Sequence, residues 1–81
     1  MVSAYVLRSK KTGFLYKGIT NNIGRRLEEH NDNKNKGTRG NGPWELIYFE
    51  EFPTRAEARK RETYFKSGAG REYLRKLNIP R

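Results

Sequence analysis

Two runs of β-forming residues, separated by a short turn, dominate the start of this sequence and limit how it can fold. Residues 2–9 and 14–19 are rich in valine, isoleucine and aromatic side chains, and Lys10–Gly13 between them reads KKTG. Polar residues followed by glycine between two such runs are typical of a β-hairpin turn. The first nineteen residues are therefore predicted to form two antiparallel strands.

The register of this hairpin decides whether two tyrosines lie together. If Leu7 lies opposite Tyr16, then Tyr5 lies opposite Gly18, and both tyrosines are diagonal neighbours on one face. Gly18 would then leave space beside the Tyr5 ring. A glycine bulge in the turn would shift the register by one residue and separate the tyrosines, unless the bulge itself compensated, so both registers stay open.

Helix N-cap residues and glycine-rich segments predict where the remaining helices and strands begin and end. Thr20, Asn21 and Asn22 are all candidate N-caps for a helix that runs to about His30. Residues 31–43 are polar, basic and rich in glycine, which predicts a surface loop. Three further elements are expected: a strand with core side chains over 44–51, a helix from the capping box Thr54–Glu57 to about Ser67, and a short helix over 71–77 after a break at 68–70.

The element order is thus β-β-α-β-α with a short C-terminal helix. A small three-stranded antiparallel sheet flanked by helices is the natural way to bury these apolar faces, which defines an α+β fold. At 81 residues, we expect residues 1–81 to form a single domain.

The charge of the chain indicates a polyanionic partner. It carries 18 Lys and Arg against 9 Asp and Glu, a formal net charge of +9. Nucleic acid is the first candidate partner. The absence of cysteine and the single histidine exclude disulfides and a multi-histidine zinc site. No apolar run is long enough to span a membrane, and no signal-peptide block opens the chain, so we expect a soluble, cytoplasmic protein without a membrane partner.

Polar side chains interrupt the apolar stripes of both longer helices. At roughly 100° per residue, Arg26 and His30 lie on the same stripe as Ile23 and Leu27. Glu62 lies on the inward stripe of the second helix by the same count. Isolated buried charges are costly, so these three side chains must be paired or must line a wet cleft. We expect one polar pocket where both helices meet the sheet.

These residues and their spacing resemble the GIY-YIG nuclease domain over nearly the whole chain. The first motif element is present as Ala4-Tyr5-Val6 and the second as Tyr16-Lys17-Gly18, with Ser3-Ala4 in place of the first glycine-isoleucine pair and Lys17 where Ile or Val is usual. The helix signature corresponds to Arg26-Leu27 with His30. The context ARKRETYFKS resembles that of the family's metal-binding glutamate and points to Glu62, and the ending SGAGREYLRK resembles that of small stand-alone members.

The resemblance implies hydrolysis of phosphodiester bonds in DNA with a divalent ion, Mg²⁺ or Mn²⁺. RNA stays open as a substrate, and branched or damaged DNA structures are candidates. Arg26 would stabilise charge on the phosphate, and Glu62 would hold the metal. Tyr5 would be the general base, with Tyr16 and His30 orienting the water or the phosphate.

Two expectations concern the surroundings of this site. A phenol has an ordinary pKa of about 10, so a basic Tyr5 needs nearby cations that lower it, and Lys17 and Arg26 are the candidates. Lys17 and Arg39 are also candidates for contacts with nucleic-acid phosphates. Two alternatives to an active nuclease remain: a non-catalytic nucleic-acid-binding module on the same fold, and a nuclease that needs a protein partner for specificity or activity.

Overall fold

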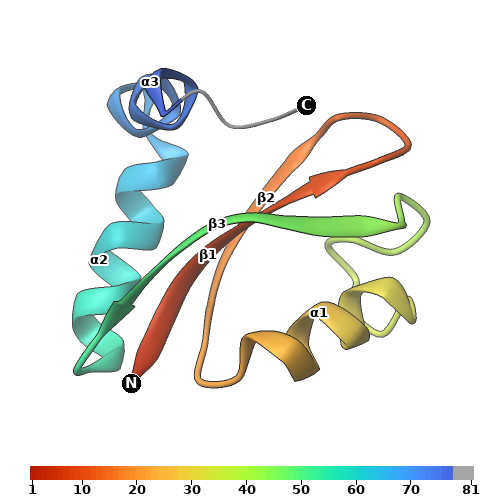
Figure 1. The fold of residues 1–81 in the computed structure, drawn as a ribbon, viewed down its shortest axis with the longest axis horizontal. Helices are drawn as coiled ribbons and strands as arrows, with labels where there is room; N and C mark the ends of the chain where they lie inside the picture. The colour runs from red at the N-terminus through yellow and green to blue at the C-terminus, as the bar shows by residue number, and fades with distance from the viewer. Residues whose placement is uncertain (78–81) are drawn as a thin grey trace.

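The computed structural model describes residues 1–77 and contains the predicted α+β arrangement. Its elements are β1 (Val2–Ser9), β2 (Leu15–Thr20), α1 (Ile23–Asn31), β3 (Trp44–Phe52), α2 (Arg55–Lys66) and α3 (Gly68–Lys76). The three strands form one antiparallel sheet in the order β2-β1-β3, so β1 is the central strand. In Figure 1, α2 and α3 lie at the left of the sheet and α1 at the lower right.

The hairpin adopts the register that keeps the tyrosines together. Tyr5 lies opposite Gly18, and Leu7 lies opposite Tyr16. Gly13 has a φ of 79°, a left-handed conformation that glycine adopts without strain, and its amide donates to the carbonyl oxygen of Ser9. The turn therefore accommodates glycine without shifting the strands.

The central strand divides the core between the two faces of the sheet. Ala4 and Val6 pack against Phe65 of α2 and Leu74 of α3 on one face. On the other face, a second apolar cluster is built around Tyr5, Leu7 and Trp44, with Tyr16, Leu27 and Leu46 packed against it. Phe49, predicted to belong to the core, is 46% exposed; it lies opposite Tyr5 on the edge strand β3 and belongs to neither apolar cluster.

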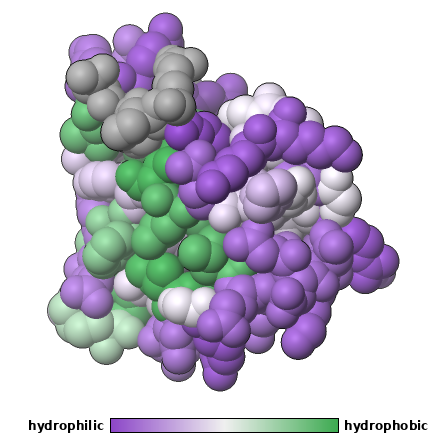
Figure 2. All heavy atoms as spheres, turned by 45° about the vertical axis from the view of Figure 1, so that its right-hand side comes forward, coloured by the Kyte–Doolittle hydropathy of each residue, from purple (hydrophilic) through white to green (hydrophobic). Residues whose placement is uncertain are grey.

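An irregularity in β3 changes which residues face the helices. Val6 pairs with Tyr48, but the next residue of β1, Leu7, pairs with Leu46, so Ile47 is the extra residue of a β-bulge. Both Ile47 and Tyr48 pack against the cluster under α2 and α3. Apolar side chains gather in one band in Figure 2, with hydrophilic side chains over most of the rest of that face.

Arg61 fixes α2 against the sheet. Its guanidinium donates to both carboxylate oxygens of Glu50, at 2.9 and 3.2 Å, and lies over the rings of Tyr64, Phe65 and Tyr73 at 4.7 to 5.1 Å. A bidentate ion pair combined with cation–π contacts uses the planar geometry of arginine. The neighbouring residue, Glu62, therefore has a defined orientation.

The helix boundaries confirm two predicted caps and correct one element. Asn22 is the N-cap of α1, and Thr54 accepts from the amide of Glu57 at the start of α2. The predicted break between the last two helices is present but lies at Ser67 rather than at 68–70, because Ser67 ends α2 and caps α3 at once, and α3 begins at Gly68. None of the helices in residues 1–77 has the length and apolar character needed to cross a membrane.

Candidate active site

A buried hydrogen bond between Tyr5 and His30 lies at the centre of the candidate site. The Tyr5 hydroxyl is 3.0 Å from Nε2 of His30, and the two side chains come from the central strand and from the last turn of α1. Tyr5 is 3% exposed and His30 is fully buried. This accounts for the position of His30 on an apolar stripe, since a buried imidazole needs hydrogen-bond partners.

The other ring nitrogen of His30 is bonded to Thr38. Nδ1 of His30 and Oγ1 of Thr38 are 2.7 Å apart, and the Thr38 hydroxyl lies 3.4 Å from the carbonyl oxygen of Asn35, which can only accept. If Thr38 donates its single proton to that carbonyl, Nδ1–H of His30 donates to Thr38. Nε2 is then the acceptor for the Tyr5 hydroxyl. This assignment satisfies every polar atom in the series.

Thr38 lies in the predicted surface loop, where the sequence suggested only a phosphate contact or a solubilising side chain and not a partner of His30. It is fully buried, and its carbonyl oxygen accepts from Nε1 of Trp44 at 3.1 Å. Asn31 closes the loop from the other end, since its side chain bonds the amide and the carbonyl of Trp44. The loop therefore folds over His30. A threonine amid glycines and charged residues gives little sequence signal for this role.

Tyr16 lies against His30 on the same face of the sheet. The ring centroids of Tyr16 and His30 are 4.8 Å apart, and those of Tyr16 and Tyr5 are 6.4 Å apart. Tyr16 also meets the edge of the Trp44 ring. The structure thus brings Tyr5, Tyr16 and His30 together as the hairpin register predicts.

Arg26 and Glu62, the two predicted charged residues of the site, come from different helices, α1 and α2. Arg26 is half-buried, and its guanidinium lies 3.3 Å from Glu29, whereas Arg25 is exposed. The side chain of Glu62 is only 13% exposed and accepts from Nζ of Lys66 at 3.0 Å. Both Arg26 and Glu62 act electrostatically on Tyr5. The polar pocket was predicted where both helices meet the sheet, and α1 and α2 cover opposite faces of that sheet.

Burial controls the ionisation of the two central groups. It raises the pKa of the Tyr5 hydroxyl well above its usual value; Tyr16 and Glu62 add to this effect, and Arg26 opposes it. Burial also lowers the pKa of His30, and Arg26 lowers it further. Arg26 therefore lowers the Tyr5 pKa as predicted, but burial outweighs it and the net shift is upward; Lys17 is not among the groups that act on Tyr5. At neutral pH Tyr5 and His30 are both uncharged.

The two predicted phosphate contacts lie outside this central group. Lys17 pairs with Val6, so its side chain lies on the face of α2 and α3, opposite Tyr5. Arg39 is exposed in the loop directly after Thr38, and its Nε donates to the carbonyl oxygen of Asn33 at 3.3 Å.

Comparison with known proteins agrees with this arrangement of strands, helices and tyrosines. The sequence model of the GIY-YIG catalytic domain matches residues 1–78, and the chain belongs to this nuclease family. UPF0213 proteins of Clostridium perfringens and Bacillus licheniformis are 46% and 52% identical to it over 63 residues, which are 76% of this chain. The matched segments cover 67% and 64% of those relatives' own lengths.

A solved structure supports the fold as well. The solution NMR structure of a UPF0213 protein from Bacillus halodurans superposes with a TM-score of 0.56 at 36% sequence identity, covering 95% of this chain and 85% of that one. Its family and fold agree with the α+β arrangement described above.

Proposed function

We propose that this protein is a divalent-metal-dependent endonuclease that hydrolyses phosphodiester bonds of DNA, with residues 1–81 acting as one nuclease domain. The buried hydrogen bond between Tyr5 and His30, within electrostatic reach of Arg26 and Glu62, is the observation that carries the proposal. The net charge of +9 supports a nucleic-acid substrate.

Arg26 is the proposed electrophilic group. Hydrolysis of a phosphodiester develops negative charge on the non-bridging oxygens, and a guanidinium stays charged and can donate two parallel hydrogen bonds to them. Arg26 is half-buried and is held by Glu29 on its own helix. An incoming phosphate would compete with this weak i,i+3 pair.

Glu62 is the proposed metal ligand. Mg²⁺ is commonly bound by one or two carboxylates, completed by water and substrate phosphate, so a site with one carboxylate fits this ion. Residues 1–77 contain no cluster of three or more His, Cys, Asp or Glu side chains, and Glu62 is the carboxylate that we propose as the metal ligand. When bound, the ion would stabilise the developing charge and the leaving oxygen.

Tyr5 and His30 are the proposed proton-handling pair. The phenol oxygen accepts a proton from the attacking water while the phenol proton passes to Nε2 of His30, 3.0 Å away. The Nδ1–H of His30 stays bonded to Thr38 throughout. This relay avoids forming a free phenolate, which the raised pKa of Tyr5 makes unfavourable. Tyr16, packed on the imidazole, is placed to orient the water or the phosphate.

A non-catalytic nucleic-acid-binding module is the second candidate. In the protein alone, Glu62 is paired with Lys66 and Arg26 with Glu29, so both charged groups already have partners. A binding module would keep these pairs and would bind DNA or RNA in a salt-sensitive way without cleaving it. A nuclease that depends on a protein partner would also appear inactive alone, and would gain activity when the partner is added.

Paired substitutions on the same helices test the proposal. Branched, gapped and intact DNA substrates and a matched RNA are incubated with Mg²⁺ or Mn²⁺. Arg26→Ala is compared with Arg25→Ala, and Glu62→Gln with Glu57→Gln. We expect the first variant of each pair to lose about 10²–10³-fold in cleavage rate, and the second to stay near wild type. Equal activity of all four variants would overturn the proposal.

A further inference from the structure

Two basic side chains on the face opposite Tyr5 have no acidic partner in the described part of the chain. Lys17 of β2 and Arg71 of α3 form no ion pair within residues 1–77, whereas nearby Arg8 and Arg75 are paired with Glu45 and Glu72. Lys17 lies on the sheet face that α2 and α3 cover, because it is paired with Val6. It is half-buried, which removes part of the hydration that stabilises an ammonium.

The surroundings of Lys17 repel positive charge. Burial lowers its pKa, and Arg71 and Lys66 lower it further as like charges. Such a cluster is stabilised when an anion binds between its members. The arrangement therefore favours a negatively charged ligand at the junction of β2 with α2 and α3.

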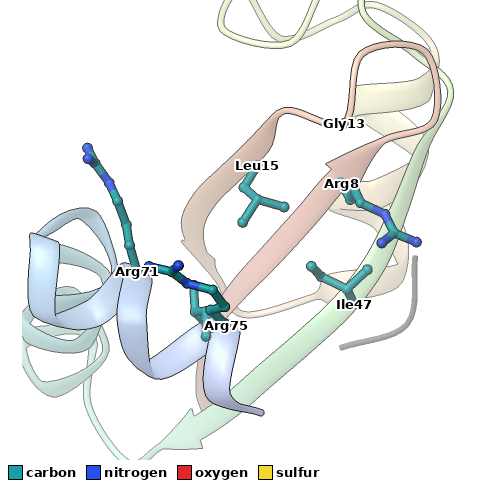
Figure 3. Close-up of a pocket in the computed structure, with 7 residues that line it drawn as sticks. Arg8, Gly13, Leu15, Ile47, Arg71 and Arg75 are labelled. Carbon is teal, nitrogen blue, oxygen red and sulfur yellow. The ribbon is translucent and has the colours of Figure 1, made fainter. Parts of the chain in front are cut away.

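A pocket of about 200 Å³ lies between α3 and the sheet next to this cluster. In Figure 3, Arg71 and Arg75 extend from α3 on one side and Arg8 lies on the other, with Leu15 and Ile47 on the strands between them. Leu15 is two residues before Lys17 on β2, so both side chains are on the same face. The pocket combines an apolar floor with a basic rim.

One hydrogen bond connects the surroundings of Lys17 with a residue of the candidate active site. Lys66, which is close enough to affect the Lys17 pKa, is bonded to Glu62 at 3.0 Å, and Glu62 in turn acts electrostatically on Tyr5. The Lys66–Glu62 hydrogen bond thus links a residue that acts on Lys17 with a residue of the candidate active site. A polyanion long enough to reach both residues would contact both sites.

We propose that Lys17, Arg71 and the adjoining pocket form a second phosphate-binding site, which holds the backbone of the nucleic acid away from the cleaved bond. Arg71 would bind a phosphate through its planar fork and Lys17 as a point charge, while the apolar floor contacts a sugar. The inference rests on the proposed function, because it takes the ligand to be the substrate of the Tyr5 site.

Binding measured without metal tests this site separately from cleavage. A fluorescein-labelled DNA oligonucleotide is titrated with protein in chelator at several salt concentrations. The double variant Lys17→Gln with Arg71→Gln is compared with a double variant of equal charge, Arg59→Gln with Lys60→Gln, whose side chains are exposed on α2. We expect the slope of log K against log salt to shrink by about 1.5 to 2 in the first variant only. An unchanged slope, or an equal loss in the second variant, would overturn the proposal.

Methyl NMR signals of Leu15 and Leu74 give an independent readout. Both residues line the pocket, so the oligonucleotide should shift their signals in the wild type and not in the Lys17 and Arg71 double variant. Equal shifts with inorganic phosphate at the same phosphate concentration would mean that a free anion suffices, and would contradict a nucleic-acid site. If the protein binds DNA through Lys17 and Arg71 but cleaves no substrate, the proposed nuclease activity is refuted and the phosphate-binding site is retained.

Discussion

The ring of Tyr5 occupies the space that a side chain at position 18 would fill. A Cβ at Gly18 would lie 2.6 Å from the Tyr5 hydroxyl oxygen and 2.8 Å from the carbon that carries it. Because position 18 has no side chain, the Tyr5 hydroxyl can lie close to β2. This placement keeps it within hydrogen-bond distance of His30. The last glycine of the second motif element has a physical role in positioning the first tyrosine.

Gly18→Ala should therefore displace Tyr5. We expect a loss of stability of about 1–3 kcal/mol from overpacking, together with a fall in cleavage rate, because the hydroxyl can no longer keep its place beside His30. Gly24→Ala is the matched control, since only Asn22 Oδ1, at 3.7 Å, lies near its added methyl group. Urea denaturation and a plasmid-nicking assay measure the two effects, and equal behaviour of both variants would contradict this role of Gly18.

Gly70→Ala should be strongly destabilising. A Cβ there would lie 1.8 Å from the backbone carbonyl oxygen of Tyr64 and 2.6 Å from Cα of Phe65, so α2 and α3 would have to separate. We expect a loss of about 3 kcal/mol, at the upper end of overpacking effects. Gly68→Ala, with open space around it, should be neutral or slightly stabilising in the same helix. Thermal unfolding of the two variants shows whether the close contact between α2 and α3 requires glycine at position 70.

Stability should fall as His30 is protonated. Burial lowers its pKa in the folded protein, so the unfolded chain binds this proton more tightly. The free energy of unfolding should therefore decrease as pH drops below about 6.5 toward the lowered pKa, by about 1.4 kcal/mol for each pKa unit of difference. Urea denaturation between about pH 5 and 8 measures this, above the range where most carboxylates titrate. His30→Gln should remove the decrease; an unchanged slope in that variant would assign it to another group.

Thr38→Val tests whether Thr38 holds the tautomer of His30. The substitution keeps the shape and removes the hydroxyl, leaving Nδ1 of His30 without its 2.7 Å partner. We expect a loss of about 1–3 kcal/mol of stability and a lower cleavage rate. His30 is the only histidine, so ¹⁵N NMR reads its tautomer without overlap. Thr38→Ser should retain both the tautomer and the activity, whereas a Val variant with an unchanged tautomer would exclude this positioning role.

Much of the site follows from residue spacing, because helix and strand periods fix which side chains share a face. The opposition of Tyr5 to Gly18 came from counting across the KKTG turn, and the inward direction of Arg26 and His30 came from the helical period. The burial of Thr38 could not be foreseen, since it depends on a loop whose path is set by tertiary bonds to Asn31 and Trp44.

Two errors have different physical origins. Lys17 was expected beside Tyr5 because it follows Tyr16 directly in the sequence. The alternation of side chains along β2 instead places Lys17 on the opposite face of the sheet. The glycines at 68–70 were interpreted as a break, but the close contact of Gly70 with α2 requires glycine within a helix. The first error concerns the alternation of side chains along a strand, and the second concerns packing between two helices.

The most direct test of the account is cleavage of supercoiled plasmid by the wild type and by Tyr5→Phe. The phenylalanine variant removes only the hydroxyl bonded to His30, and Tyr64→Phe is the control, because the Tyr64 hydroxyl contacts the Ala69 carbonyl of α3. We expect nicking by the wild type in Mg²⁺ or Mn²⁺, none in chelator, and a loss of at least about 10²-fold in Tyr5→Phe. If Tyr5→Phe cleaves as fast as the wild type, this hydroxyl does not handle the proton of the attacking water.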